Sequence, residues 1–351
     1  MCGFVLIQAL TSAVVDSIVP DLRDSEYSRK IAYLQARRRE SPGRPLLIFL
    51  GSSRTAYGVA ADEALTDRDA PLAYNFGILA GGPIYEMLYF HRLLAEGIRP
   101  QWLVLEIHPG FLHVAANLML AHRPAIERRD FSDMCALHGY VDHPWQDWLA
   151  WLRYRAAFSF QLRAELMRRI APHWASAPAI PDWTALDKTT PSGWVPAPGP
   201  RPDAALRKQR AQWGCEAFGA SYRDFEVSDR TNRALRDILE TCRRERIEVS
   251  LLLMPESAEM RDASATLAQR EVRCYLAALS DEYGAPIIDA TDWCASEDFA
   301  DGQHLLPEAG PRLARRLGRE VLADWIATAP PAGQPSQTRL MAGRPRETKQ
   351  R

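Results

Sequence analysis

The stretch PLLIFLGSSRT, residues 45–55, decides the expected fold, because five consecutive apolar residues run into a turn of small and polar ones. A short apolar run that ends at such a turn is typical of a buried β-strand, since a buried helix needs about ten residues or more. The stretch therefore predicts a strand that ends near Gly51 and is followed by Ser52 and Ser53 in the adjoining loop.

Further apolar runs of the same kind follow along the chain, and most of them alternate with helical patterns. The runs cover residues 71–77, 101–107, 248–254 and 285–290, and the helical patterns cover residues 85–98, 230–247, 271–284 and 311–326. Strands that are apolar throughout and alternate with helices indicate a parallel sheet covered on both faces. We therefore expect an α/β fold, a three-layer α/β/α sandwich around a five-stranded parallel sheet.

Polar and small residues gather where the predicted strands end. In open parallel sheets, ligands bind outside the carboxyl ends of the strands. The residues expected at that edge are Ser52–Ser53, Gly77–Gly82, His108–Gly110, Glu256 and Asp301–His304. A site at this edge would combine residues from both halves of the chain.

Composition narrows the class of protein. The chain has 351 residues, of which 47% are hydrophobic and 25% charged, as in an ordinary globular protein. Its formal net charge of −1 does not favour nucleic acid or an acidic membrane as the main partner. The six cysteines are scattered without a C-x-x-C pair, which favours reduced thiols and implies no metal site.

The first residues are apolar, and two interpretations of them stay open. The segment from Cys2 to Val19 is short of the roughly 20 residues that span a bilayer and contains Asp16, whose charge is costly at bilayer depth. It could still be a membrane anchor or its remnant. Alternatively, Phe4, Ile7, Leu10, Val14 and Ile18 fall at the spacing of an amphipathic helix that packs on the protein.

Residues 112 to about 225 interrupt the alternation and read as a helical and loop insertion after the third strand. Residues 145–170 predict one helix, with Trp145, Trp148 and Leu152 on one face and Leu162, Leu166 and Ile170 continuing it. Seven of the ten tryptophans lie in this insertion. They could stack on sugar rings, but we expect them chiefly to form its core. The tail from Pro330 is polar, Pro-rich and basic, and is expected to be disordered.

Two short motifs carry residue types that catalyse reactions. Ser53 stands on a sharp turn directly after a strand, and DGQHL, residues 301–305, puts Asp301 three positions before His304. A serine becomes a good nucleophile when a histidine takes its proton and a carboxylate orients that histidine. The alternatives are that the serine caps a helix, as serines often do, and that His304 is a solvated loop residue with an incidental Asp.

Taken together, these residues resemble the SGNH/GDSL hydrolase family over roughly residues 44–111 and 245–325, in the family's order. FLGSSRT, residues 49–55, is similar to the first block, which makes Ser53 the nucleophile. DGQHL is similar to the last block, which makes His304 the base and Asp301 the residue that orients it. The layout looks most like divergent bacterial members related to polysaccharide O-acetylation proteins.

The two middle blocks match less well. NFGILAGG, residues 75–82, resembles the second block, whose glycine N–H helps to form the oxyanion hole, so that Gly81 or, alternatively, Gly77 takes this role. The third block, G-x-N-D, is not matched, because Gly110 stands about where the family has its Asn. His108 is either a substitute oxyanion donor or an ordinary histidine at a strand end.

The resemblance implies a flavodoxin-like sheet domain and a serine esterase or O-acyltransferase that acts on an acyl ester of a small molecule or glycan, without cofactor or metal. It divides the chain into an N-terminal helical segment (1–43), an SGNH hydrolase-like domain (44–327) with its insertion, and a tail (328–351). Two alternatives remain. One is a weak or inactive member that binds glycan or lipid, and the other is an acyl-transfer subunit that works with a membrane partner.

Overall fold

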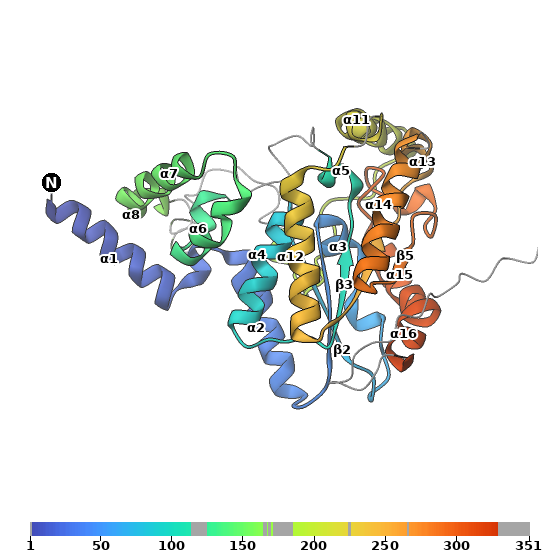
Figure 1. Cartoon of the computed structure of the whole chain (residues 1–351), viewed down its shortest axis with the longest axis horizontal. Coiled ribbons are helices and arrows are strands. Elements are labelled where there is room, and N and C mark those ends of the chain that lie inside the picture. The colour runs from blue at the N-terminus through green and yellow to red at the C-terminus, as the bar shows by residue number, and fades with distance from the viewer. Residues whose placement is uncertain are drawn as a thin grey trace, which may run out of the picture.

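The computed structural model describes residues 2–113, 125–163, 167, 170, 185–223, 226–264 and 267–328. Its centre is a five-stranded, all-parallel sheet with the strand order β2-β1-β3-β4-β5, flanked by helices (Figure 1). The strands are β1 (Leu46–Gly51), β2 (Leu72–Gly77), β3 (Trp102–Glu106), β4 (Glu248–Leu253) and β5 (Ile287–Asp289). The expected α/β fold with a five-stranded parallel sheet is confirmed.

The sheet buries both of its faces because its central strands are apolar on both. In β1, Leu46, Ile48 and Leu50 belong to one apolar cluster, whereas Leu47 and Phe49 belong to another on the opposite face. The first cluster is completed by α2 (Ser25–Glu40), α4 (Pro83–Ala95), α12 (Asp229–Glu245) and α14 (Leu267–Tyr283). The second is completed by α15 (Ala309–Leu317), a π-helical turn (Gly318–Leu322) and α16 (Ala323–Thr328). We call the sheet with these helices the sheet domain.

Further helices gather near the carboxyl ends of the strands. They are α3 (Ser53–Gly58) after β1, α5 (Pro109–Leu112) after β3, α13 (Ala258–Ser264) after β4, and α11 (Ala204–Arg223), which packs on α13 and α5. Figure 1 shows α5, α11 and α13 at the upper edge, toward which β3 points. This edge is where the sequence analysis expects the site.

Four helices stand beside the sheet domain and form what we call the lateral helical unit (Figure 1, left). They are α1 (Cys2–Ile18), α6 (Phe131–Leu137), α7 (Pro144–Ala156) and α8 (Phe158–Gln161). The single helix predicted over residues 145–170 is wrong, because the backbone leaves the helical region at Ala157, between α7 and α8. The described part of the insertion is helical or irregular, as expected, whereas Trp174, Trp183, Leu166 and the tail from Pro330 lie outside the described residues.

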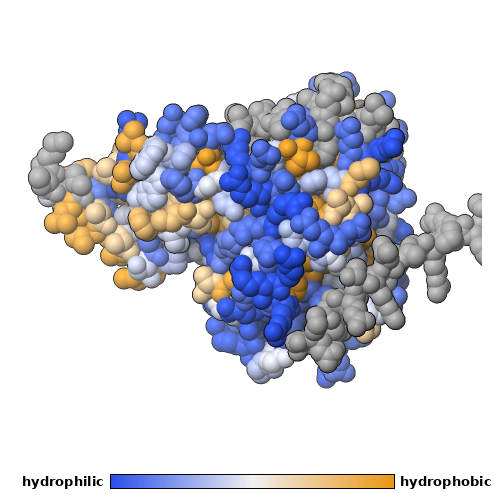
Figure 2. Space-filling view, in the orientation of Figure 1, coloured by the Kyte–Doolittle hydropathy of each residue, from blue (hydrophilic) through white to orange (hydrophobic). Residues whose placement is uncertain are grey.

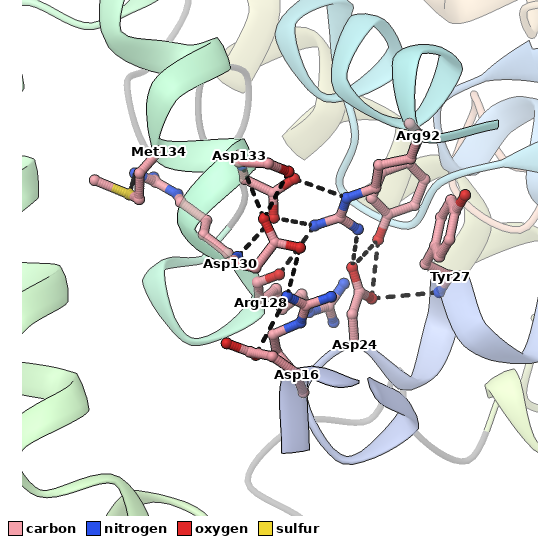
Figure 3. Close-up of polar contacts among 12 residues, drawn as sticks. Asp16, Asp24, Tyr27, Arg92, Arg128, Asp130, Asp133 and Met134 are labelled. Atoms are coloured by element: carbon pink, nitrogen blue, oxygen red, sulfur yellow. Dashed lines mark hydrogen bonds and ion pairs between the residues drawn. The ribbon is translucent and has the colours of Figure 1, made fainter. Parts of the chain in front are cut away.

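An ionic cluster attaches the lateral helical unit to the sheet domain (Figure 3). Arg92 of α4 lies between two buried carboxylates, with Nη1 2.7 Å from Asp24 and Nη2 2.6 Å from Asp133 of α6. Tyr89 donates a hydrogen bond to Asp24, and Arg128 pairs with Glu26 at 3.0 Å. Burial by itself would raise the pKa of Asp24, but Arg92 and Arg128 hold it below its ordinary value.

Two expectations about apolar residues outside the sheet are corrected by the structure. The stripe of α1 does not pack on the protein, since Ile7 and Ile18 are 60% and 72% exposed. The tryptophans do not all form a core either, because Trp145 and Trp213 are 79% and 70% exposed. Within the described residues, no helix has the length and apolar character needed to cross a membrane.

Candidate active site

The turn after β1 gives its two serines different roles. Ser52 is the buried N-cap of α3: its hydroxyl accepts the Arg54 N–H at 3.1 Å and donates to Glu106 at 2.9 Å. Ser53 is the first residue of α3, and its hydroxyl lies 2.8 Å from Nε2 of His304. The hydroxyl that meets the histidine is therefore that of the second serine.

Glu106, at the end of β3, holds this turn, and sequence reasoning missed it. Its carboxylate accepts hydrogen bonds from the N–H and hydroxyl of Ser52 and from the N–H and hydroxyl of Thr55, at 2.6–3.2 Å. Glu106 lies so close that a Cβ on Gly51 would stand 2.5 Å from it, which explains the glycine. The sequence signal was an acidic residue closing an apolar run, which otherwise reads as a solvated strand end.

The loop between β5 and α15 completes a line of hydrogen bonds from Ser53. His304 Nδ1 lies 2.7 Å from Asp301 Oδ2, while Asp301 Oδ1 accepts the N–H groups of His304 at 2.9 Å and Gln303 at 3.2 Å. The structure thus brings Ser53, His304 and Asp301 together although 251 residues separate the first two. One carboxylate both orients the imidazole and fixes the loop that carries it.

Electrostatics set the proton positions along this line. Burial tends to raise the pKa of Asp301, but His304 and the backbone donors lower it to about 2, so the carboxylate is ionised at neutral pH. An ionised carboxylate only accepts hydrogen bonds, so Nδ1 of His304 carries a proton and Nε2 of a neutral imidazole is left to accept the Ser53 hydroxyl. The ring of Tyr57, from α3, stands edge-on to the imidazole at 5.4 Å. In this arrangement His304 can act as a general base toward Ser53.

The glycines that the resemblance offers as oxyanion donors lie after β2 but have no free N–H in this structure. The Gly77 N–H donates to Asn75 Oδ1 at 2.8 Å, and the Gly81 N–H donates to the Ile78 carbonyl at 3.0 Å. Gly77 has another use, because a Cβ there would stand 2.4 Å from the Ala56 nitrogen of α3. The expectation that one of the two offers a free donor is therefore not met here.

Asn75 is a second residue that sequence reasoning missed. Its buried amide donates to the carbonyls of Thr55 at 2.7 Å and Val59 at 2.6 Å, and its oxygen accepts the Gly77 N–H. It thereby fastens α3, which carries Ser53, to β2. A polar residue inside the apolar run LAYNFG was the signal.

Two other donors lie near the serine. In the described part of the chain, the N–H of Ser53 has no hydrogen-bond acceptor. His108 caps α5, with Nδ1 accepting the Gly110 N–H at 3.1 Å and Nε2 3.4 Å from Oε1 of Gln303, the neighbour of His304. Burial, then Arg54, lowers the pKa of His108 well below its ordinary value, so the ring is neutral and Nε2 carries its proton.

Glu256 lies at the same edge of the sheet, but its carboxylate contacts Arg54 and not the serine or the histidine of the site. Its carboxylate lies 3.4 Å from Nη1 of the buried Arg54, whose Nη2 donates to the carbonyls of Met254 and Pro255. Arg54 also lines a cavity of about 60 Å³ with Arg261 and Asp289. The contact with Arg54 gives Glu256 no direct link to Ser53 or His304.

No protein-family model matches this chain. No significant match to a curated protein was found either.

Proposed function

We propose that this protein is a serine esterase or O-acyltransferase of the SGNH/GDSL type, acting on an acyl ester of a small molecule or a glycan. The observation that carries the proposal is the line from the Ser53 hydroxyl through His304 to Asp301, with successive distances of 2.8 and 2.7 Å. The cap of helix α3 is Ser52, so capping does not explain the position of Ser53, and a loop hydrogen bond explains only the contact of Asp301 with His304. Neither explains why all three side chains align.

In the proposed reaction, Ser53 Oγ attacks the carbonyl carbon of the ester while Nε2 of His304 takes the hydroxyl proton. The imidazolium, held by Asp301, returns that proton to the leaving alkoxide, and an acyl-serine remains. Water or an acceptor hydroxyl then gives its proton to His304 and attacks the carbonyl carbon of the acyl-serine. The bond to Ser53 Oγ breaks, and the imidazolium returns its proton to that oxygen, which restores the free serine and the neutral histidine. Water makes the enzyme an esterase, and a sugar hydroxyl makes it an acyltransferase.

The oxyanion hole is the least complete part of the proposed catalytic site, and this supports a second candidate function. Near the serine, the Ser53 N–H has no acceptor among the described residues, whereas the N–H groups of Gly77 and Gly81 are engaged within the chain. Nε2 of His108 lies 3.4 Å from Gln303 and would have to exchange this contact for an oxyanion. Loss of one oxyanion donor typically costs about 10²–10³ in turnover. The second candidate is accordingly a protein of the same fold that binds an acylated glycan or lipid with little turnover.

Labelling with a fluorophosphonate separates the two candidates, because such a reagent reacts quickly only with an activated serine. We expect rapid labelling of wild type, with the adduct located on the Ser53 peptide by mass spectrometry, and none in Ser53→Ala. His304→Ala is the matched control, since it keeps the serine and removes its base. Labelling of Ser52, or equal labelling of wild type and Ser53→Ala, would refute the assignment of Ser53.

A comparison of turnover on p-nitrophenyl acetate then tests the oxyanion donors. We expect a modest wild-type rate, which His108→Ala lowers further and Gly110→Asn raises if the added amide reaches the oxyanion. A robust wild-type rate that His108→Ala leaves unchanged would show that backbone donors suffice. Fluorophosphonate labelling without measurable turnover would favour the binding protein.

A further inference from the structure

Helix α1 carries polar residues inward and most of its apolar residues outward, with Val15 as a buried apolar exception. Gln8 and Ser12 are buried: Gln8 accepts the Ser159 N–H of α8 at 2.8 Å, and Ser12 accepts a hydrogen bond from Arg155 of α7. On the outer side, Leu10 is 58% exposed, and the other outward apolar residues are Phe4, Leu6, Ile7, Val14 and Ile18. Helices of water-soluble proteins have the reverse arrangement.

Helix α7, which packs against α1, shows the same inversion, whereas α8, which also packs against α1, buries Phe158 and exposes Phe160. The charged Asp147 and Arg155 of α7 are buried, whereas Trp145, Leu149 and Leu152 are exposed, as is Phe160 of α8. Figure 2 shows apolar residues gathered over the end of the molecule that these helices form. We call the exposed apolar residues of α1, α7 and α8 the outer apolar face.

The interior beneath this face combines ion pairs with a small apolar cluster of Val15, Phe158 and Leu162. Arg155 lies 2.7 Å from Asp16 of α1 and donates to the Arg129 carbonyl, while Arg129 lies 2.9 Å from Asp147. Arg23 adds contacts to Asp16 at 3.3 Å and to Asp130 at 2.8 Å. A buried charge is tolerable only when it is paired in this way. The inversion is therefore a built arrangement and not a loose helix.

The charged residues beside the outer apolar face indicate which kind of surface it binds. The exposed charged residue among the described side chains of α1, α7 and α8 is Arg153, and the next one along the chain is Arg163, whose guanidinium lies 3.8 Å over the Phe160 ring. Both are cationic, and the acidic side chains of these helices are paired with arginines. Aromatic and basic residues beside an apolar helical surface are the composition of helices that lie in a membrane interface.

The length of α1 shows that the helix is too short to cross a membrane. Its 17 residues make a helix of about 25 Å, shorter than the roughly 30 Å hydrocarbon core of a bilayer. Its inward polar residues Gln8, Ser12 and Asp16 contact α8 and α7 from the middle of the helix to its end. Apolar side chains face outward from Phe4 to Ile18. This geometry suits a helix that lies in the plane of the membrane with its outer side in the lipid.

We propose that the outer apolar face docks the protein onto an anionic lipid surface, with α1 in the membrane plane and Arg153 and Arg163 at the headgroups. The proposal extends the N-terminal segment considered from the sequence to a composite face in which the insertion takes part. It is independent of the proposed acyl-transfer chemistry. Docking would hold the sheet domain at the membrane and leave the strand edge with Ser53 outside the lipid.

Co-sedimentation of the full chain with vesicles tests the proposal. We expect binding to equimolar phosphatidylcholine and phosphatidylglycerol vesicles, and weaker binding to phosphatidylcholine alone. Leu10→Asp and Leu152→Asp should each lower partitioning about tenfold or more, because each removes a leucine side chain from the lipid and adds an anion. Arg153→Gln with Arg163→Gln should reduce the preference for anionic vesicles and spare binding to neutral ones.

Leu206→Asp is the matched control, since Leu206 is also exposed but lies on α11, away from the lateral helical unit (Figure 1). It should bind vesicles as wild type does, and melting curves should show all variants folded. Absence of vesicle binding, or equal binding of Leu10→Asp and wild type, would overturn the proposal. So would a dimer in light scattering that Leu10→Asp dissociates without any vesicle binding, because the face would then join two copies of this chain.

Discussion

In the sheet domain, strand β1 is buried along its whole length and the polar residues of the site lie at the strand ends. In the lateral helical unit, the ion pairs of Arg155 and Arg129 lie inside, and leucines such as Leu10 and Leu152 face outward. The two regions therefore use polar groups in opposite ways. At the sheet edge they include Ser53, His304 and Asp301, to which the proposed reaction is assigned, whereas in the lateral helical unit they hold helices together.

The difference shows that the burial of a side chain can be interpreted only together with the groups that the side chain contacts. A buried ion pair contributes little net stability, but removal of one partner costs much because the other charge is left buried alone. An exposed apolar side chain, in contrast, costs little to remove. Substitutions in the two regions should consequently change different observables.

The largest effect is expected at the sheet edge and in rate. If the proposed function holds, His304→Ala should lower esterase turnover by roughly 10⁶-fold, as loss of the triad histidine does in a serine hydrolase. The free energy of unfolding should change by about 0.5 kcal/mol or less, because the His304 side chain is partly exposed and sits in a loop. Rate assays and urea unfolding of His304→Ala and of His143→Ala, a surface control, check both parts. Strong destabilisation by His304→Ala would make the histidine structural.

The next effect is expected at the junction of the two regions, and in stability. Arg92→Gln leaves the carboxylates of Asp24 and Asp133 buried without their cation, and should cost about 3–5 kcal/mol in the free energy of unfolding. Urea unfolding measures it. Arg99→Gln is the matched control, because Arg99 pairs with Glu245 at the surface and should cost less than about 1 kcal/mol. Equal costs would show that the ionic cluster does not attach the lateral helical unit.

The third effect concerns an exception in the sheet domain, the fully buried Lys30. Its Nζ donates to the carbonyls of Gly193 at 2.7 Å and Asn75 at 3.3 Å, and burial lowers its pKa from 10.5 to about 8, although Glu26 opposes the shift. Between pH 8 and 10.5 the unfolded chain binds a proton that the folded protein does not, so stability should rise with pH there. The rise attributable to Lys30 is up to about 3 kcal/mol.

Urea unfolding of wild type and Lys30→Met from pH 8 to 10 isolates this contribution, because other groups titrate equally in both proteins. The stability of Lys30→Met relative to wild type should fall as the pH increases. Parallel curves would mean that Lys30 keeps an ordinary pKa in the folded protein.

The smallest effect is expected on the outer apolar face. In water, Leu10→Asp should change the free energy of unfolding by about 0.5 kcal/mol or less, since the leucine is 58% exposed and leaves no cavity. Leu251→Ala in β4, where the leucine is fully buried, should cost about 2–5 kcal/mol. Thermal or urea unfolding of the pair makes the comparison. A large loss in Leu10→Asp would show that α1 packs its apolar side after all.

Several features could be predicted from the sequence because they depend on neighbours along the chain. The apolar run before Gly51 determined a buried strand, and repetition of that pattern determined the parallel sheet. Asp301 and His304 are three positions apart, so the motif DGQHL alone predicted their contact. The sequence also predicted one edge for the strand-end residues, since parallel strands end on the same side.

Other features were decided only by the tertiary structure. The approach of Ser53 to His304 depends on how β1 and the loop after β5 are placed in the sheet, and the role of Glu106 depends on β3 lying beside β1. Gly77 and Gly81 looked free in the sequence, but hydrogen bonds inside the folded chain occupy their N–H groups. In α1, the spacing of Ile7, Leu10 and Val14 predicted an apolar stripe but not that it faces outward. Periodicity reports that a helix has two unlike sides, whereas the partners of each side are set by chain segments more than a hundred residues away, such as Arg155 on Asp16.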